Sequence, residues 1–164
     1  RIKRDKENYN LVNREKVRSA GSAEEAAIIL SAPCYKNKKV LLTTGSKTVG
    51  VYSHLEGFKD NYYLRMLPNV QMLGEVLQSG IKNSNVICMQ GPFSENMNYE
   101  MIKNYGIEVM VTKNSGNTGG TQEKINAAMR AGTEVIIIED TGSDECIGIG
   151  LSEALKYITE IVEK

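Results

Sequence analysis

Glycine occurs beside hydroxyl, amide or cationic residues in four short segments, a combination suited to holding an anion. The segments are residues 43–47, 89–94, 112–120 and 139–143. Glycine permits positive φ angles and close backbone approach, which phosphate and carboxylate sites need. Lys47 and Lys113 lie in these segments and Arg65 lies in the apolar run at residues 62–66, and all three could add positive charge at the rim. The sequence therefore predicts a local anion site built from backbone N–H groups and a few cations.

The residues do not support a metal site, a Ser-His-Asp hydrolase or a P-loop. His54 is the only histidine and the three cysteines form no CxxC pair, so we predict no metal site. A Ser-His-Asp hydrolase would have to use His54, which no nucleophile elbow accompanies. Gly45 is followed by Ser46 and not by lysine, and the required upstream glycine is missing, which excludes a P-loop.

Five β-branched or apolar runs recur roughly every 24 positions, which leaves room between them for a loop and a helix. They cover residues 40–44, 62–66, 86–89, 109–112 and 135–138. The last run is apolar at every position, as expected for a strand that is buried on both faces. The pattern predicts an α/β fold, a Rossmann-like doubly wound parallel sheet of about five strands with helices on both faces.

Helical patterns fill the gaps between the runs. The predicted helices cover residues 26–30, 70–78, 94–105, 121–131 and 151–162. A capping box at residues 22–25 precedes the first helix, and Ser94 caps the third. The second helix is predicted to place Val70, Leu73 and Leu77 on one face.

The carboxyl edge of the predicted sheet carries the chemically useful residues. In open parallel sheets, ligands bind outside the carboxyl ends of the strands, and the four glycine-containing segments all follow predicted strands. The opposite strand ends carry turn residues such as Lys38 and Lys39 without a comparable cluster. We therefore expect the ligand site at the carboxyl edge. Within it, Asp140 and Asp144 are either general acids or loop caps.

The composition is that of an ordinary globular domain, with 41% hydrophobic and 24% charged residues. Twenty basic residues balance twenty acidic ones, so no long-range field would attract nucleic acid or an anionic membrane. The apolar runs are too short to span a bilayer, no signal peptide is visible, and three scattered cysteines fit a reducing compartment. We expect a cytoplasmic protein without nucleic-acid or membrane partners.

Several strings at these strand ends match one known family in order and spacing. They are residues 41–47, residues 65–68, residues 89–94 with Glu95 and Asn98, and residues 111–116 with 118–120. They resemble the precorrin-6A and cobalt-precorrin-6A reductase family of cobalamin biosynthesis, to whose C-terminal half residues 22–140 correspond. The resemblance implies two Rossmann-like domains with the reaction in the cleft between them. Residues 22–164 would form the C-terminal domain, and residues 1–21 would continue from a missing N-terminal domain, which fits the start at Arg1.

The resemblance also implies a nicotinamide-dependent reduction of one double bond of the precorrin-6A or cobalt-precorrin-6A macrocycle, a tetrapyrrole with carboxylate arms. NADPH or NADH would supply the hydride, and an unidentified donor would protonate the neighbouring carbon. To the cofactor, or to substrate anions beside it, we assign Thr44, Gly45, Ser46, Gln90, Gly91, Ser94, Ser115, Gly116, Gly119 and Gly120. Arg65, Lys47 and Lys113 are assigned to substrate carboxylates, and Lys113 is the candidate catalytic residue.

One position departs from the family pattern. An Arg-Pro pair is expected after the fifth strand, where this chain has Glu139-Asp140, so the role of that arginine is not carried over. The isolated chain is expected to fold but to turn over little substrate, because half of the cleft is absent. The alternative is a non-catalytic Rossmann-like domain that binds a nucleotide or a phosphorylated small molecule.

Overall fold

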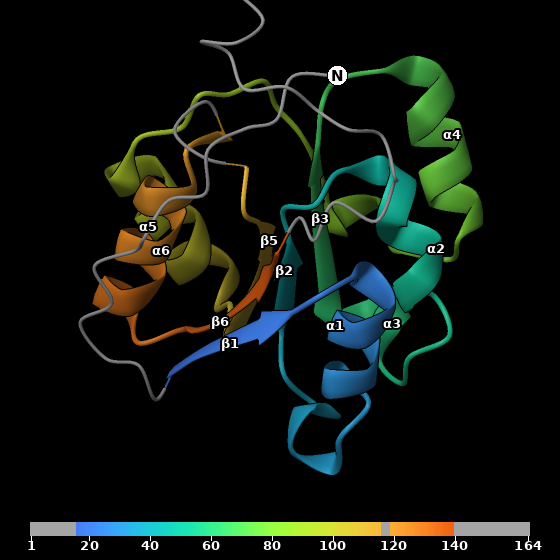
Figure 1. Cartoon of the computed structure of the whole chain (residues 1–164). Coiled ribbons are helices and arrows are strands. Elements are labelled where there is room, and N and C mark those ends of the chain that lie inside the picture. The colour runs from blue at the N-terminus through green and yellow to red at the C-terminus, as the bar shows by residue number, and fades with distance from the viewer. Residues whose placement is uncertain (1–15, 116–118, 140–164) are drawn as a thin grey trace, which may run out of the picture.

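Six strands form one all-parallel sheet in the order β1-β6-β5-β2-β3-β4 (Figure 1). The structure is a computed structural model, and it describes residues 16–115 and 119–139. The strands are β1 (Val17–Ala20), β2 (Val40–Leu42), β3 (Tyr62–Met66), β4 (Val86–Cys88), β5 (Val109–Lys113) and β6 (Glu134–Ile138). The predicted Rossmann-like parallel sheet is confirmed.

Helices cover both faces of this sheet (Figure 1). One face carries α5 (Glu95–Tyr105) and α6 (Thr121–Ala131). The other carries α1 (Ala23–Leu30), α2 (Val49–Tyr52), α3 (Phe58–Asn61) and α4 (Val70–Gln78). Short 3₁₀ turns span Pro33–Tyr35, Ser46–Thr48 and Asn83–Asn85. No helix in the described ranges is long and apolar enough to pass through a membrane. The predicted helix over residues 151–162 lies outside these ranges.

The edge strand β1 was not among the five predicted strands. It pairs in parallel with β6, beginning with Val17 opposite Val135. Its middle residues, Arg18 and Ser19, are exposed, so it lacks the continuous apolar run that marks the other strands. A polar composition is common at sheet edges, where it discourages pairing with other chains.

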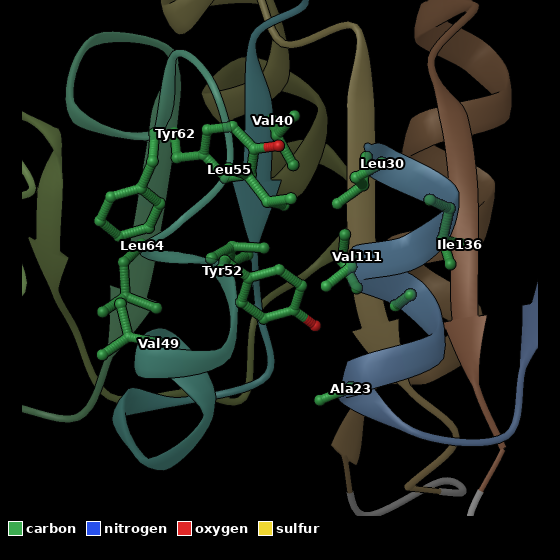
Figure 2. Packing of buried hydrophobic residues seen from close by; sticks show 14 of the residues in the cluster. Ala23, Leu30, Val40, Val49, Tyr52, Leu55, Tyr62, Leu64, Val111 and Ile136 are labelled. Atoms are coloured by element: carbon green, nitrogen blue, oxygen red, sulfur yellow. The ribbon is translucent and has the colours of Figure 1, made fainter. Parts of the chain in front are cut away.

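The central strands are buried on both faces, and their side chains alternate between two hydrophobic clusters. Val40 and Leu42 enter the cluster beneath α1 to α4, whereas Leu41 and Met110 enter the cluster beneath α5 and α6. Figure 2 shows the first cluster, with the Tyr52 ring packed among its aliphatic side chains. The Tyr52 hydroxyl is buried and has no hydrogen-bond partner among the described residues.

The helix ends follow the predicted capping signals. Ser22 Oγ accepts the Glu25 N–H at 3.2 Å, and Glu25 Oε2 accepts the Gly21 N–H at 2.6 Å, so the capping box is shifted by one residue. Ser94 Oγ accepts the N–H three residues further along at 3.2 Å. Helix α5 then ends at Gly106, whose φ of 66° suits glycine.

The apolar face of α4 that the sequence indicated differs at one position from the face that packs against the sheet. Val70 is 90% exposed, because it is the first residue of the helix and projects away from the core. The face that packs against the sheet consists of Met72, Leu73, Val76 and Leu77, of which Val76 is fully buried. This i, i+1, i+4, i+5 pattern also has helical period, and only the packing distinguishes the two alternatives.

Candidate functional site

A pocket of about 310 Å³ lies at the carboxyl ends of β2, β3 and β4, beside the start of α6. The strand order reverses next to it, because the chain runs outward from β2 to β4 and then returns to β5 on the other side of β2. Such switch points are where open α/β sheets bind ligands. The lining residues are Thr43, Gly45, Arg65, Met66, Leu67, Met89, Gly91, Pro92, Phe93, Gly119, Gly120 and Lys124.

The loops after β4 and β5 meet at this pocket, although two strands separate them in the sheet. A Cβ atom on Gly120 would lie 3.9 Å from the Phe93 carbonyl oxygen. Five of the residues that the sequence singled out therefore line one pocket together, namely Gly45, Arg65, Gly91, Gly119 and Gly120.

Arg65 is a buried cation that lines the pocket from β3, with 6% of its surface exposed. Its Nη1 donates a hydrogen bond to Asn98 Oδ1 at 2.7 Å, and the guanidinium lies 4.1 Å from the centre of the Phe93 ring. Asn98 Nδ2 in turn donates to the Ser94 carbonyl at 2.9 Å, which fixes the amide. Burial lowers the pKa of Arg65 to about 10. No acidic residue of the described ranges forms an ion pair with it.

Lys124, on the first turn of α6, is a second buried cation at the same pocket and is 8% exposed. Within the part of the chain that the structure describes, its ammonium has no hydrogen-bond or ion-pair partner. Burial, and next the charge of Arg65, lower the pKa of Lys124 to about 8, whereas Glu123 acts in the opposite direction. The sequence analysis missed this residue. Its position between Thr121 and Ala128, at helical spacing on the buried stripe of α6, was the available signal.

Among the residues that the structure describes, no acid pairs with either cation, so the pocket carries excess positive charge. Buried charges are costly unless they are paired, and two cations close together also repel each other. An anion between Arg65 and Lys124 would relieve both costs. Met66, Leu67 and Phe93 add an apolar wall, so the pocket can accept a ligand that carries an anionic group on an apolar body.

The loop after β2 brings only Gly45 and Thr43 to the pocket. Gly45 has φ 84° and ψ 173°, a conformation essentially limited to glycine, and a Cβ atom there would meet nothing within 4 Å. The backbone is therefore open to close approach by a ligand. Thr44 is buried and its hydroxyl lies 2.8 Å from Thr48 Oγ1, so it stabilises the turn. Ser46 and the exposed Lys47 lie outside the lining.

The loop after β4 contributes Gly91 and Phe93. A Cβ atom on Gly91 would lie 3.1 Å from the Phe93 ring, which is tighter than ordinary contact. Ser94 uses its hydroxyl as the cap of α5, and Gln90 is exposed beside the pocket and does not line it. This loop therefore supplies backbone and an aromatic face rather than hydroxyl groups.

The loop after β5 is held by its own side chains. The Ser115 N–H donates to Thr121 Oγ1 at 3.3 Å, and Thr121 Oγ1 donates to the Lys113 carbonyl at 3.4 Å. A Cβ atom on Gly119 would lie 1.6 Å from Ser115 Oγ, so packing within the loop already requires glycine there. Ser115 and the exposed Lys113 are not lining residues, and Gly116 lies outside the described residues.

The opposite edge of the sheet also has a hollow, of about 360 Å³, which the sequence did not indicate. Its cations are already engaged. Glu134 accepts hydrogen bonds from Tyr35 Oη and from Arg18 Nε at 2.9 Å, and its other oxygen lies 3.4 Å from Lys38 Nζ. Lys16 Nζ donates to the Gly132 carbonyl at 2.8 Å. Because the cations of this hollow already have partners, whereas Lys124 has none among the described residues, the carboxyl-edge pocket is the better ligand site.

Comparison with known proteins supports a single family. The family model described as "Precorrin-6x reductase CbiJ/CobK" matches residues 1–160. The chain belongs to the precorrin-6x reductase family. The cobalt-precorrin-6A reductase of Priestia megaterium is 38% identical over 117 residues, which is 70% of this chain and 45% of that protein. That of Methanocaldococcus jannaschii is 31% identical over 139 residues, or 84% of this chain and 53% of that protein. The chain therefore spans about half the length of the curated relatives it matches.

A solved structure of a CobK precorrin-6A reductase has the same fold as this family member. It matches with a TM-score of 0.71 at 20% sequence identity, over 97% of this chain and 60% of that one. The family and fold that the loop strings resembled are thus confirmed.

The pocket of this precorrin-6x reductase family member suits the anionic part of a nicotinamide cofactor as well as a carboxylate. Gly45 leaves open space beside its backbone, and the Lys124 ammonium is a donor without a partner among the described residues. Both features are typical of phosphate and carboxylate sites. At about 310 Å³ the pocket has room for one arm or one end of such a ligand.

Proposed function

We propose that this chain is part of a nicotinamide-dependent reductase that saturates one double bond of cobalt-precorrin-6A or precorrin-6A. The observation that carries the proposal is the pair of buried cations, Arg65 and Lys124, at a carboxyl-edge pocket with an apolar wall. A tetrapyrrole with carboxylate arms combines an apolar ring with anionic groups and needs such a site. The names of the curated relatives point to the same substrate class.

The residues divide between the two proposed ligands. The nicotinamide cofactor, when bound, supplies the hydride. The backbone at Gly45, Gly91 and Gly120 would hold its anionic groups, since these residues line the pocket without side chains. Arg65, with the exposed Lys113 and Lys47 nearer the solvent, would hold substrate carboxylates.

The apolar wall would contact the macrocycle. Leu67 is 62% exposed at the pocket, and Met66, Met89 and Phe93 continue the apolar surface inward. Exposed apolar side chains beside buried charges are typical of ligand sites. A ring on this wall would keep water from the reacting carbons and position them against the cofactor.

We further propose that the site is completed by the remaining part of a two-domain reductase, since the chain spans about half of its relatives. The isolated chain would then bind ligands weakly and turn over little substrate.

Glu139, at the position where the family pattern has arginine, accepts a 2.8 Å hydrogen bond from Asn114 Nδ2. In this chain the position therefore stabilises the loop after β5.

The test is reduction of cobalt-precorrin-6A by the complete protein with NADPH or NADH. We expect turnover by the wild type and a loss of at least about a hundredfold in kcat/KM for Arg65→Met. Arg130→Met is the matched control, because Arg130 lies on α6 and bonds Asn96 away from the pocket. Absence of turnover by the wild type, or equal activity of the two variants, would reject the proposed function.

A further inference from the structure

The arrangement of Arg65 and Lys124 points to one specific task within the proposed function, on which this inference rests. The two residues come from β3 and α6, yet both line the same pocket and both are more than nine-tenths buried. Their charges act on each other, and no acid of the described residues pairs with either. Removing two cations from water without an anion is unfavourable, so we expect an anionic ligand between them.

We propose that Arg65 and Lys124 clamp one carboxylate arm of the tetrapyrrole between them. The Arg65 guanidinium uses Nη1 for Asn98 and Met101. Its Nε and Nη2 have no partner among the described residues and remain available to a planar carboxylate. Phe93 stacks on the guanidinium and Asn98 fixes its orientation, so the fork is held in place before the ligand arrives. Lys124 supplies the second charge as a flexible point donor.

A carboxylate fits this clamp better than a phosphate group does. Phe93 lies against the Arg65 guanidinium and Met66 lines the same pocket, and these apolar side chains suit an arm that leaves an apolar ring. Gly45 and Gly91, whose backbone is suited to phosphate, line the same pocket. A phosphate of the dinucleotide shares the required charge, however, and the experiment below separates the two sources.

Binding should be coupled to proton uptake. The pKa of Lys124 is about 8 without an anion, so about half of the protein carries a neutral amine near pH 8. A carboxylate beside the ammonium favours the charged form and raises this pKa, so binding takes up about half a proton there. Near pH 6.5 the Lys124 amine is already protonated before the ligand binds, so binding should take up no proton there.

Few charged groups modify this behaviour. Arg65 acts on Lys124 from β3 and disfavours the ammonium, while Glu123 on α6 favours it. From α5 the side chains that reach Arg65 are the neutral Asn98 and Met101. The proton uptake can therefore be assigned to Lys124 by substitution.

The experiment is calorimetric titration of the complete protein in two buffers of different ionisation enthalpy. The probes are uroporphyrin III, a stable tetrapyrrole with carboxylate arms, NADP+ and inorganic phosphate. We expect the wild type to take up protons when it binds uroporphyrin III near pH 8. Lys124→Met should bind uroporphyrin III at least about tenfold more weakly and without proton uptake, whereas Lys124→Arg should keep near-normal affinity. Lys103→Met, an exposed lysine of α5, should behave like the wild type.

Three results would overturn the clamp. The first is wild-type affinity and uptake for uroporphyrin in Lys124→Met. The second is a loss confined to NADP+ or phosphate, which would make the pair a phosphate site. The third is absence of uroporphyrin binding by a wild type that binds NADP+. In each case, continued turnover of cobalt-precorrin-6A by the wild type would leave the proposed function standing, and absence of that turnover would reject it too.

Discussion

Replacing Lys124 by methionine should stabilise the protein near neutral pH, although it removes a pocket residue. Burial lowers the pKa of Lys124 from its ordinary 10.5 to about 8. Each pKa unit is worth about 1.4 kcal/mol, so keeping the ammonium charged in the folded state costs on the order of 3 kcal/mol. Methionine has a similar length and no charge, and the variant should regain a free energy of unfolding of that order.

The pH dependence gives this prediction its sign. The unfolded chain binds the Lys124 proton more tightly than the folded protein, so wild-type stability rises between pH 8 and 10.5. From about pH 7 to about pH 9.5 this rise amounts to about 2 kcal/mol. Urea denaturation should show that Lys124→Met is more stable than the wild type at about pH 7. At about pH 9.5 the difference in free energy of unfolding between the two proteins should be smaller by about 2 kcal/mol. A difference that is absent, or that does not change with pH, would refute a buried and unpaired ammonium.

Two other substitutions test interactions away from the carboxyl-edge pocket. Tyr52→Phe should raise the free energy of unfolding by about 1 kcal/mol, because it removes a buried hydroxyl without a partner among the described residues; a lower melting temperature would contradict this. Glu134→Gln should destabilise the protein at neutral pH, since Glu134 pairs with Arg18 and Lys38. Burial opposes the charge of Glu134, but the hydrogen bonds from Tyr35 and Arg18 outweigh it and lower its pKa. The contribution of Glu134 to the free energy of unfolding is present above the ordinary pKa of 4.5 and is lost as the pH falls through the lowered pKa. If the free energies of unfolding of Glu134→Gln and the wild type keep a constant difference in acid, the pairing is refuted.

Local signals predicted most of the fold. The apolar run at Val135–Ile138 and the caps at Ser94 and Gly106 act within a few residues, so the sequence displays them directly. The edge strand β1 was missed because Arg18 and Ser19 are polar and the strand depends on β6 for its hydrogen bonds. Long-range pairing of this kind leaves no local trace.

A pocket at the carboxyl edge could be predicted from the sequence, but its detailed lining could not. Parallel topology brings all strand ends to one edge, so the convergence of the loops could be expected. The role of an individual residue could not be predicted. At Gly119, for example, contact with Ser115 already requires glycine whether or not a ligand binds. Lys124 was overlooked although it shares a helical stripe with Thr121 and Ala128, because a lysine more often lies at a solvent-exposed position than on a buried face.

The most direct test of the account is a crystal structure of the complete protein with a carboxylated tetrapyrrole bound. The account predicts a carboxylate between Arg65 and Lys124, with the ring against Leu67 and Phe93 at the carboxyl edge of the sheet. A tetrapyrrole bound elsewhere, for example at the opposite edge beside Glu134, would contradict it.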